Sequence, residues 1–463
     1  MCIGSDIVAK DRILRPSKNI DFTSGNIVKA LIMFAIPIFM GDVLQNMYQS
    51  VDSLVVGNYV GENALAAVSV CGTLSRLIVG FFNGMSVGAS VVVARAFGSK
   101  DEHELTSSIN VTFMFSVLLG TALSLIGIIL TPVLIRLCGV NDDVYGEAVQ
   151  YLRIYLAGTL FTIVYNVSAG ILRACGDSRS TFTILLISSI LNIFLDLFFV
   201  SVIPMGVAGV ALSTVIAQFI SVLVACHRIR RLNNTFRIIS VKEFLHNKQT
   251  IYSIMKIGMP SGLQGSLISV SNLFVWRHIS SFDSAAAIAG IGIAQRLDRF
   301  AALPAKSFGL AVTTFISQNE GAKNHGRAKQ GIISSILLAA GTTLVVSVVI
   351  YTFAGDLTVL FNDSPEIISI STAMMRTIIP FYATMVIREI MLGVLRGYGN
   401  TRVPMILSIT GMIAVRQVYL YFALRISHTL KVVYYCYPLA WGATALMLLV
   451  YYLVLRAKKG NRI

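Results

Sequence analysis

The chain has 463 residues, of which 55% are hydrophobic and only 13% are charged, and its formal net charge is +15. A soluble domain carries about twice that charged fraction, so the composition argues against an ordinary soluble protein. The basic excess could indicate nucleic-acid binding, but the basic residues gather in loops on one side of the apolar segments, which argues against that interpretation.

Twelve apolar segments follow one another, each long enough to cross a bilayer as a helix, which takes about 20 residues. We expect an all-α integral membrane protein with spans at approximately 29–55, 65–90, 108–135, 149–172, 183–203, 207–227, 253–276, 286–316, 331–354, 368–395, 405–425 and 433–455. Lys and Arg are concentrated in the two tails and in the loop after the sixth span. By the positive-inside rule, this asymmetry predicts a multi-pass protein of the cell (inner) membrane with both termini in the cytoplasm.

An internal repeat relates the two halves of the chain. A shift of 223 residues places Pro37 on Pro260 without a gap, and it aligns 172–179 with 395–402, where four of eight residues are identical. Because six spans return the chain to its starting side, we expect two parallel six-helix lobes related by a pseudo-two-fold axis along the membrane normal. The predicted organisation is a cytoplasmic tail (1–28), an N-terminal lobe (29–227), a basic linker (228–252), a C-terminal lobe (253–455) and a basic tail (456–463).

Several motifs resemble those of the multidrug and toxic compound extrusion (MATE) family of bacterial transporters. They are Pro37 with the following Gln45-x-x-Tyr48-x-x-Val51-Asp52-Ser53, the Leu-Arg-x-x-Gly that closes the fourth and tenth spans, and Thr314-Phe315-Ile316-Ser317-Gln318 after the eighth. The resemblance covers nearly the whole chain. It implies a secondary antiporter whose two lobes alternate access and exchange H⁺ or Na⁺ for polyspecific, often cationic, amphipathic small molecules.

Ionisable groups at bilayer depth are costly and are therefore candidates for functional sites. Asp52 lies in the first span, and Asn192 and Asp196 lie one turn apart on the fifth, so these two face the same way. The resemblance implies a coupling-ion site at these three residues. The family often adds an Asn directly before the Gly of the fourth-span motif, but here that residue is Ala169. Either the nearby Asn166 substitutes for it, or the site has lost a ligand.

Two carboxylates in apolar surroundings can take up a proton near neutral pH or bind a hard cation through oxygen. H⁺ and Na⁺ both stay open as the coupling ion, with the missing amide weighing against Na⁺. We expect no cofactor and no other metal, the only candidate metal site being one for Na⁺ at Asp52 and Asp196. A purely structural role for these carboxylates is the alternative.

The coupling site is not duplicated, because the repeat places Asp52 on Val275 and Asp196 on Tyr419. The second half instead has Glu389 in the tenth span and Arg416 near the middle of the eleventh. A lone arginine at that depth is unfavourable, so we predict a Glu389–Arg416 ion pair. It could be a structural clamp or a second substrate or proton site.

A substrate cavity between the lobes is predicted to contain polar and aromatic side chains, since aromatic rings stack on planar cations. The chain lacks a phosphate-binding loop for ATP and a Ser/His/Asp grouping, so we expect no enzyme activity. The expected partners are small-molecule drugs or toxic metabolites and membrane lipids, with no nucleic acid, and the chain is expected to be a monomer. Two alternatives stay open: a flippase of lipid-linked oligosaccharides from the same superfamily, and a membrane scaffold without transport. The candidate cavity residues are Asp42, Gln45, Tyr48, Tyr155, Trp276 and Tyr382.

Overall fold

The computed structural model describes residues 19–459, apart from the side chains of 49–59, 62, 63, 65, 73, 76, 77 and 459. This described part consists of helices joined by short turns and contains no strand. The predicted all-α fold class is confirmed.

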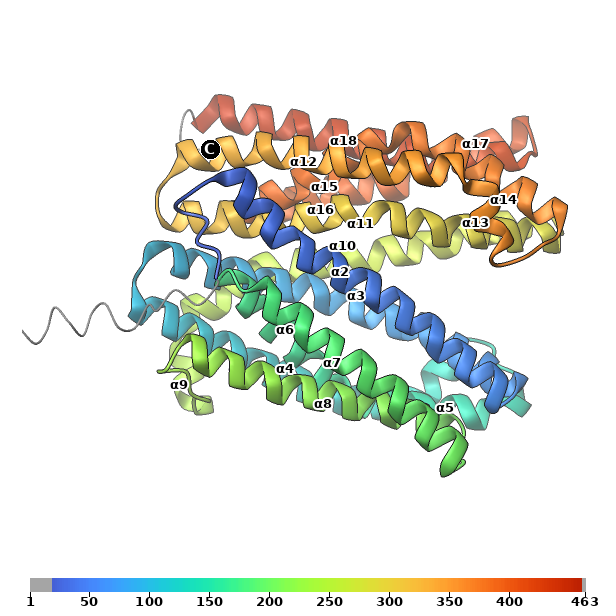
Figure 1. Ribbon diagram of the computed structural model, residues 1–463, viewed down its shortest axis with the longest axis horizontal. Helices are drawn as coiled ribbons and strands as arrows, with labels where there is room; N and C mark the ends of the chain where they lie inside the picture. The colour runs from blue at the N-terminus through green and yellow to red at the C-terminus, as the bar shows by residue number, and fades with distance from the viewer. Residues whose placement is uncertain (1–18, 460–463) are drawn as a thin grey trace, which may run out of the picture.

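The first six spans are made of seven α-helices and one π-helical turn (Figure 1). Two of these helices, α5 and α6, form one span that bends by 43°. The segments are α2 (Ile27–Tyr59), α3 (Glu62–Ser99), α4 (Glu102–Leu137), α5 (Asp142–Ala157), α6 (Thr159–Ala174), α7 (Ser178–Leu197), the π-turn η1 (Phe198–Val202) and α8 (Val207–Leu232).

A short linker helix, α9 (Val241–His246), leads to the last six spans. In this half, non-α turns join α14 to α15 and α16 to α17, so each of these pairs crosses as one span. The segments are α10 (Lys248–Ser280), α11 (Ala285–Gly321), α12 (His325–Thr352), α13 (Ala354–Val359), α14 (Pro365–Ile378), η2 (Ile379–Phe381), α15 (Tyr382–Gly397), α16 (Arg402–Ile409), η3 (Thr410–Val415), α17 (Arg416–Ile426) and α18 (Leu430–Lys459).

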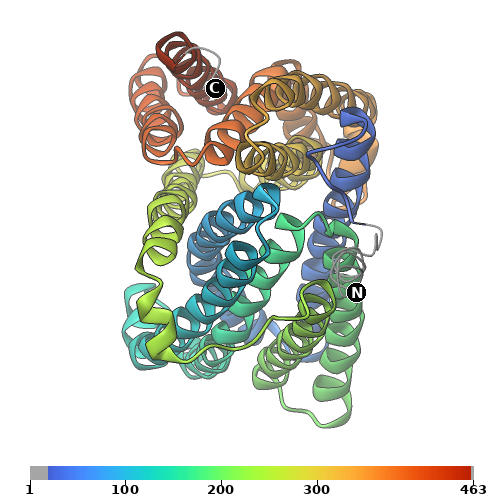
Figure 2. The same ribbon diagram turned by 90° about the vertical axis from the view of Figure 1, so that its left-hand side faces the viewer.

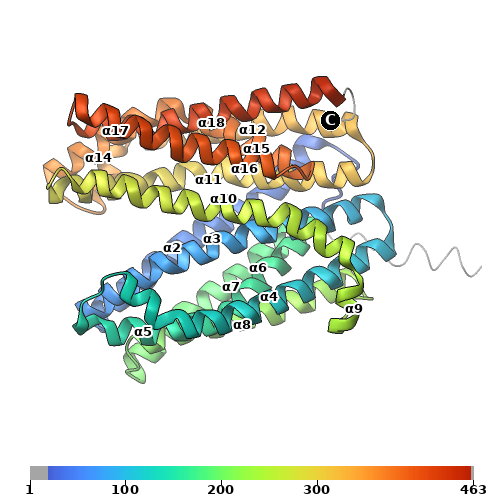
Figure 3. The same cartoon turned by 180° about the vertical axis from the view of Figure 1, so that it is seen from behind.

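In the described part, ten helical segments are long and apolar enough to cross a membrane, and the bent pair α5–α6 makes an eleventh. The remaining predicted span is α10, which has 33 residues and runs alongside the others (Figure 3). It is less apolar because it contains glycine, serine, amide and charged residues, and its glycines at 258, 262 and 265 lie against α3. The arrangement is that of twelve helices in two six-helix lobes, viewed end-on in Figure 2.

The two lobes touch along a seam of glycines between α3 and α10. A Cβ atom at Gly84 would lie 2.2 Å from the backbone nitrogen of Gly262, and one at Gly88 would lie 2.4 Å from that of Gly258. Both distances are far below van der Waals contact, so only hydrogen fits at these positions. Small residues allow membrane helices to approach in this way and to pack backbone against backbone.

Helix α2 belongs to both lobes. Leu31, Phe34 and Ala35, in its first turns, are buried in the core of the C-terminal lobe with Phe308 and Phe315. Its remainder packs along α7 of the N-terminal lobe. The helix therefore crosses from one lobe to the other (Figure 1).

The segment before α2, residues 19–26, forms an N-terminal strap across the end of the molecule at which the C-terminus also lies (Figure 1). Phe22 is completely buried there, and its ring packs edge-on against Phe34 and Phe315 with centroids 5.0 and 5.2 Å apart. Its backbone N–H donates to Gln318 Oε1 at 3.0 Å, and its carbonyl accepts from Asn319 Nδ2 at 3.1 Å. The strap is thus anchored on α11.

The same strap also reaches the N-terminal lobe. The backbone N–H of Ile20 donates to the carbonyl of Gly176 at 3.1 Å, in the turn between α6 and α7. Next to it, Gln318 Nε2 donates to the carbonyl of Ala174 at 2.7 Å. We call this set of contacts the strap seal, because it joins α6 to α11 across the lobe boundary.

We predict that Gly84→Ala destabilises the protein, because its new methyl group meets the backbone of α10. Overpacking of this kind costs about 1–3 kcal/mol. Gly442→Ala is the matched control, since a Cβ at this helical glycine of α18 meets no atom within 4 Å. It is expected to be neutral or stabilising by about 0.5–1 kcal/mol through helix propensity. Thermal unfolding in detergent measures both, and equal midpoints for the two variants would contradict the seam.

Candidate functional site

Asp196 and Asn192 lie on the same face of α7, as their one-turn spacing predicts, and this face contacts α8. Their side chains are only 1% and 3% exposed. Ser213 Oγ on α8 is hydrogen-bonded to Asp196 Oδ1. Asn192 Nδ2 donates to Ser213 Oγ at 3.3 Å, so an amide, a hydroxyl and a carboxyl group form a continuous chain. We call Asn192, Asp196 and Ser213 the α7–α8 polar cluster.

Two features of the backbone and side chains make this cluster unusual. The π-turn η1 (Phe198–Val202) begins just after Asp196, and such turns in membrane and soluble helices often occur at functional sites. The Asn192 Oδ1 atom is buried and has no hydrogen-bond partner within the described residues. A buried acceptor of this kind is unfavourable unless a proton donor or a cation can satisfy it.

Two other predicted members of the coupling site are not placed in this cluster. The side chain of Asp52 lies outside the described residues, and only its position in α2 is known. The amide of Asn166 donates to the carbonyl of Thr162 at 2.8 Å in its own helix, and Ala169 nearby is buried. This bond gives no support to the idea that Asn166 replaces the amide missing at Ala169.

The predicted substrate-cavity residues are divided between the lobes. On α2, Asp42 is half-buried within electrostatic reach of Arg173 and Lys306, while Gln45 is exposed and Tyr48 is half-buried. On α5, Tyr155 stacks on a neighbouring tyrosine, with ring centroids 6.2 Å apart.

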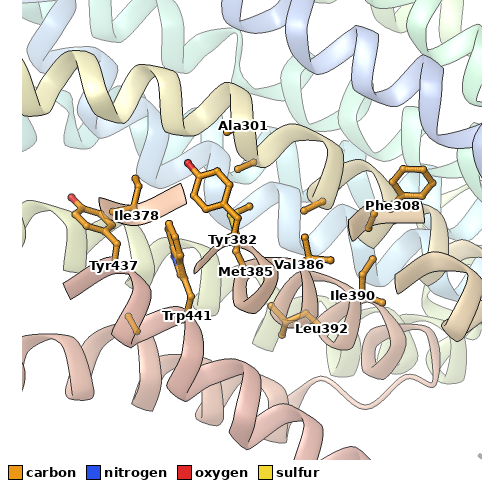
Figure 4. Packing of buried hydrophobic residues seen from close by; sticks show 14 of the residues in the cluster. Ala301, Phe308, Ile378, Tyr382, Met385, Val386, Ile390, Leu392, Tyr437 and Trp441 are labelled. Carbon is orange, nitrogen blue, oxygen red and sulfur yellow. The ribbon is translucent and has the colours of Figure 1, made fainter. Parts of the chain in front are cut away.

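The other two lie in the C-terminal lobe. Trp276 is half-buried at the edge of its core. Tyr382 Oη donates to Asp298 Oδ1 at 2.7 Å, and its ring packs against Trp441 with centroids 5.6 Å apart (Figure 4). Tyr382 is thereby bonded directly to a charged side chain of the C-terminal lobe.

A cavity of about 390 Å³ lies within the C-terminal lobe, and we call it the C-lobe cavity. Its walls come from α10, α11, α15, α18 and the α16–α17 span. Apolar side chains make one part of the wall, including Met385, Leu392 and Trp441 (Figure 4). Its polar and charged lining residues are Gln264, Asn272, Gln295, Asp298, Arg299, Lys306, Arg388, Glu389, Arg396, Ser408, Arg416 and Tyr437.

The predicted Glu389–Arg416 ion pair is wrong, although both residues line this cavity. Glu389 pairs instead with its neighbour Arg388. Arg416 donates to Ser271 Oγ at 2.8 Å and to Asn272 Oδ1 at 2.9 Å, on α10. The physical reason is reach: the long Arg388 side chain folds back on its own helix, while neutral oxygen acceptors of α10 satisfy the buried Arg416.

The sequence analysis did not predict that the charged residues of α11 and α15 line one cavity. The signal for them is a helical stripe, because Met385, Arg388, Leu392 and Arg396 recur every three or four residues on α15. Similar spacing joins the cavity residues of α11 at 295, 298, 299, 302 and 306. Polar residues on one face of adjacent spans predict a water-filled or ligand-binding interior, and this pattern could have been read before the fold was known.

A family model, MatE, matches residues 37–198 and 260–422, one copy in each half of the chain. The chain belongs to the MatE family. The two matches begin at the offset of the internal repeat, so this transporter of the MatE family is a duplicated, multi-pass membrane protein.

Curated relatives and solved structures agree with this assignment. The chain is 29% identical to the probable multidrug resistance protein YpnP of Bacillus subtilis, over 82% of this chain and 85% of that protein. It is 28% identical to YoeA of the same organism, also described as a probable multidrug resistance protein, over 93% and 94%. A structure described as the outward-facing conformation of a multidrug resistance MATE family transporter shares the fold, with a TM-score of 0.89 at 22% identity over 96% and 99%.

We predict that Ser213→Ala lowers the thermal stability of the protein, because it removes the hydroxyl group bonded to Asp196. A hydrogen bond to a charged group contributes about 1.5–3 kcal/mol. Ser221→Ala, two turns further along α8, is the control. Its hydroxyl group is equally buried but bonds only to the carbonyl of Ala217 in its own helix, at 2.8 Å. Equal unfolding midpoints for the two variants would argue against the cluster.

Proposed function

We propose that this transporter exports amphipathic small molecules in exchange for protons, by alternating access of its two lobes. The observation that carries the proposal is Asp196, a carboxyl group that is 1% exposed inside a lobe of apolar helices. Its relatives are described as probable multidrug resistance proteins, which supports small-molecule export. The family fold supplies the two lobes.

Protonation is what links Asp196 to the conformation of the lobe. A buried carboxylate is unfavourable in an apolar medium, and protonation removes its charge. If one state of the lobe stabilises the protonated form more than the other state does, proton binding shifts the equilibrium between them. One charge moved through 100 mV releases about 2.3 kcal/mol, which supports a roughly fiftyfold gradient of a neutral substrate.

A proton is favoured over Na⁺ by the groups around Asp196. A hard cation needs several oxygen ligands, whereas a proton needs only one acceptor. Among the described residues, the Ser213 hydroxyl group bonds to the Asp196 carboxyl group, and the Asn192 amide nitrogen donates to that hydroxyl group. Asn166 is engaged with its own helix. We keep Asp52 as a further member of the coupling site on the strength of the family resemblance.

The strap seal supports alternating access. Basic residues gather at the end of the molecule that carries the strap, the linker helix α9 and the end of α18, and the positive-inside rule assigns this end to the cytoplasm. There, Phe22, Ile20 and Gln318 join the two lobes. We infer that the structure is closed to the cytoplasm and that the seal must open for substrate to enter.

A flippase of lipid-linked oligosaccharides is the second candidate. Such a protein must accept an anionic phosphate group, and the C-lobe cavity contains five basic residues. The twelve spans and the buried Asp196 favour the exporter. Competition between an anionic lipid and a soluble anion for this cavity separates the two.

We predict that Asp196→Asn abolishes export driven by a pH gradient while leaving the fold intact, since Asn is isosteric but cannot bind the coupling proton. The measurement uses purified protein in liposomes loaded with a fluorescent dye, with a pH gradient and a sodium gradient imposed separately. Asp101→Asn is the control, because Asp101 caps α4 through Glu104 N–H at 3.0 Å and Asn is an equally good cap. Undiminished pH-driven transport by both Asp196→Asn and Asp52→Asn would rule out the proposed coupling.

We predict that Phe22→Ala opens the strap seal more often. The readout is Cys175, which is buried beside Gly176, in a variant that lacks the other five cysteines. Its labelling by a membrane-impermeant maleimide added from the strap side should become at least about tenfold faster, since loss of a buried Phe costs about 3–5 kcal/mol. Phe236→Ala is the control, because that buried ring packs on Phe113 within one lobe. Equal labelling rates in the two variants would contradict a gate at this position.

A further inference from the structure

The C-lobe cavity contains more positive charge than its own acidic groups can balance. Five basic residues line it, against two acidic ones. Both acidic groups already have partners within the lobe: Glu389 pairs with Arg388, and Asp298 accepts a hydrogen bond from the Tyr382 hydroxyl group. The basic residues are Arg299, Lys306, Arg388, Arg396 and Arg416.

Several of these basic side chains have donor groups left over within the described part of the chain. Lys306 is exposed and makes no hydrogen bond there. Arg416 is 1% exposed, and its Nε atom has no hydrogen-bond partner, although its terminal nitrogen bonds to α10. The buried Nε atoms of Arg388 and Arg396 also have none. Buried charged donors without acceptors are unfavourable, so their retention needs a reason beyond stability.

The internal repeat shows that the fold itself does not require these charges. The offset of 223 residues assigns to each charged cavity position an equivalent position in the N-terminal lobe, which has the same arrangement of helices. Only two of the seven equivalents are charged, and both are arginines. In the order of positions 298, 299, 306, 388, 389, 396 and 416, the equivalents are Ser75, Arg76, Asn83, Tyr165, Asn166, Arg173 and Ile193.

The rest of the wall suits the body of an organic molecule. Ile268, Met385, Leu392 and Met412 supply apolar surface, and Trp441 supplies an aromatic ring. Sites for drug-sized ligands have volumes of about 300–1,000 Å³ and combine mostly apolar walls with a few well-placed polar groups. The cavity, at about 390 Å³, lies within that range.

We propose that the C-lobe cavity binds an amphipathic organic anion, with its acidic group on Lys306, Arg388, Arg396 and Arg416 and its apolar body against Met385, Leu392 and Trp441. This ligand has the opposite charge to the cationic substrates that the family resemblance implies. A carboxylate or phosphate group is the complement of several guanidinium groups, because each can accept charge-assisted hydrogen bonds from two nitrogen atoms. Export of this ligand rests on the proposed function. Its binding does not, and binding can be measured without any transport.

The experiment compares two dyes that share a xanthene ring system and differ in charge, anionic carboxyfluorescein and cationic rhodamine 6G. Fluorescence anisotropy measures their binding to the full chain in nanodiscs of phosphatidylcholine, which has no net charge. We expect carboxyfluorescein to bind at least about tenfold more tightly than rhodamine 6G. Equal affinities, or preference for rhodamine 6G, would overturn the proposal.

Lys306→Gln is the decisive variant, because Lys306 makes no hydrogen bond in the described structure and its loss should leave the fold intact. It should weaken carboxyfluorescein binding by about tenfold and leave rhodamine 6G binding unchanged or stronger. Lys306→Arg should retain most of the affinity. Lys329→Gln removes an exposed positive charge on α12, outside the cavity, and should have no effect. Equal effects of Lys306→Gln and Lys329→Gln on carboxyfluorescein would overturn the proposal.

Two further arms identify the source of the anionic group and separate this inference from the proposed function. If phosphatidylglycerol in the nanodisc displaces carboxyfluorescein from the wild-type protein, the anionic group is that of a lipid, as in a flippase; if it does not, a soluble anion is the ligand. Both results support an anion site. Asp196→Asn should abolish pH-driven export of carboxyfluorescein from liposomes without changing its affinity. If the wild-type protein binds carboxyfluorescein but does not export it, the anion site is supported and the proposed export function is rejected.

Discussion

The close approach of α3 and α10 is the constraint on which the two-lobe arrangement depends. At Gly84 and Gly88 the backbones of the two helices are so near that no side chain fits between them. This fixes the spacing of the lobes along one line and leaves the rest of their facing surfaces free to differ. A contact made by backbone atoms depends little on side-chain rotamers, so it can persist while the lobes tilt about it.

In both lobes, a buried charged group inside the helices bonds to a hydroxyl group on a neighbouring span. Ser213 on α8 is hydrogen-bonded to Asp196 on α7, and Ser271 on α10 accepts a hydrogen bond from Arg416 on the eleventh span. In a medium without water, such bonds decide which helix faces can meet. Both lobes also contain buried groups without a hydrogen-bond partner among the described residues, such as the amide oxygen of Asn192 and the Nε atom of Arg173 in one and the Nε atoms of Arg396 and Arg416 in the other.

Much of the fold could be predicted from the sequence, because spans and repeats are long-range patterns that survive local errors. The shared face of Asn192 and Asp196 was also predictable, since it needs only helical geometry. The partner of Glu389 was not predictable, because the choice between Arg388 and Arg416 depends on side-chain reach. It also depends on Asn272, a residue far away in the chain, which accepts a hydrogen bond from Arg416. The strap was missed for a similar reason: nothing in the residues before the first span indicates that Phe22 is buried in the core of the C-terminal lobe.

The strap also has a mechanical consequence. Phe22 lies just before α2 begins, so the strap seal lies on the amino-terminal side of α2. Tension applied there would be transmitted to Ile20 and Phe22 before it reached any spanning helix. A bulky fusion or a tether attached before the strap would therefore act first on the strap seal, whereas the same attachment after α18 would act first on a helix of the C-terminal lobe.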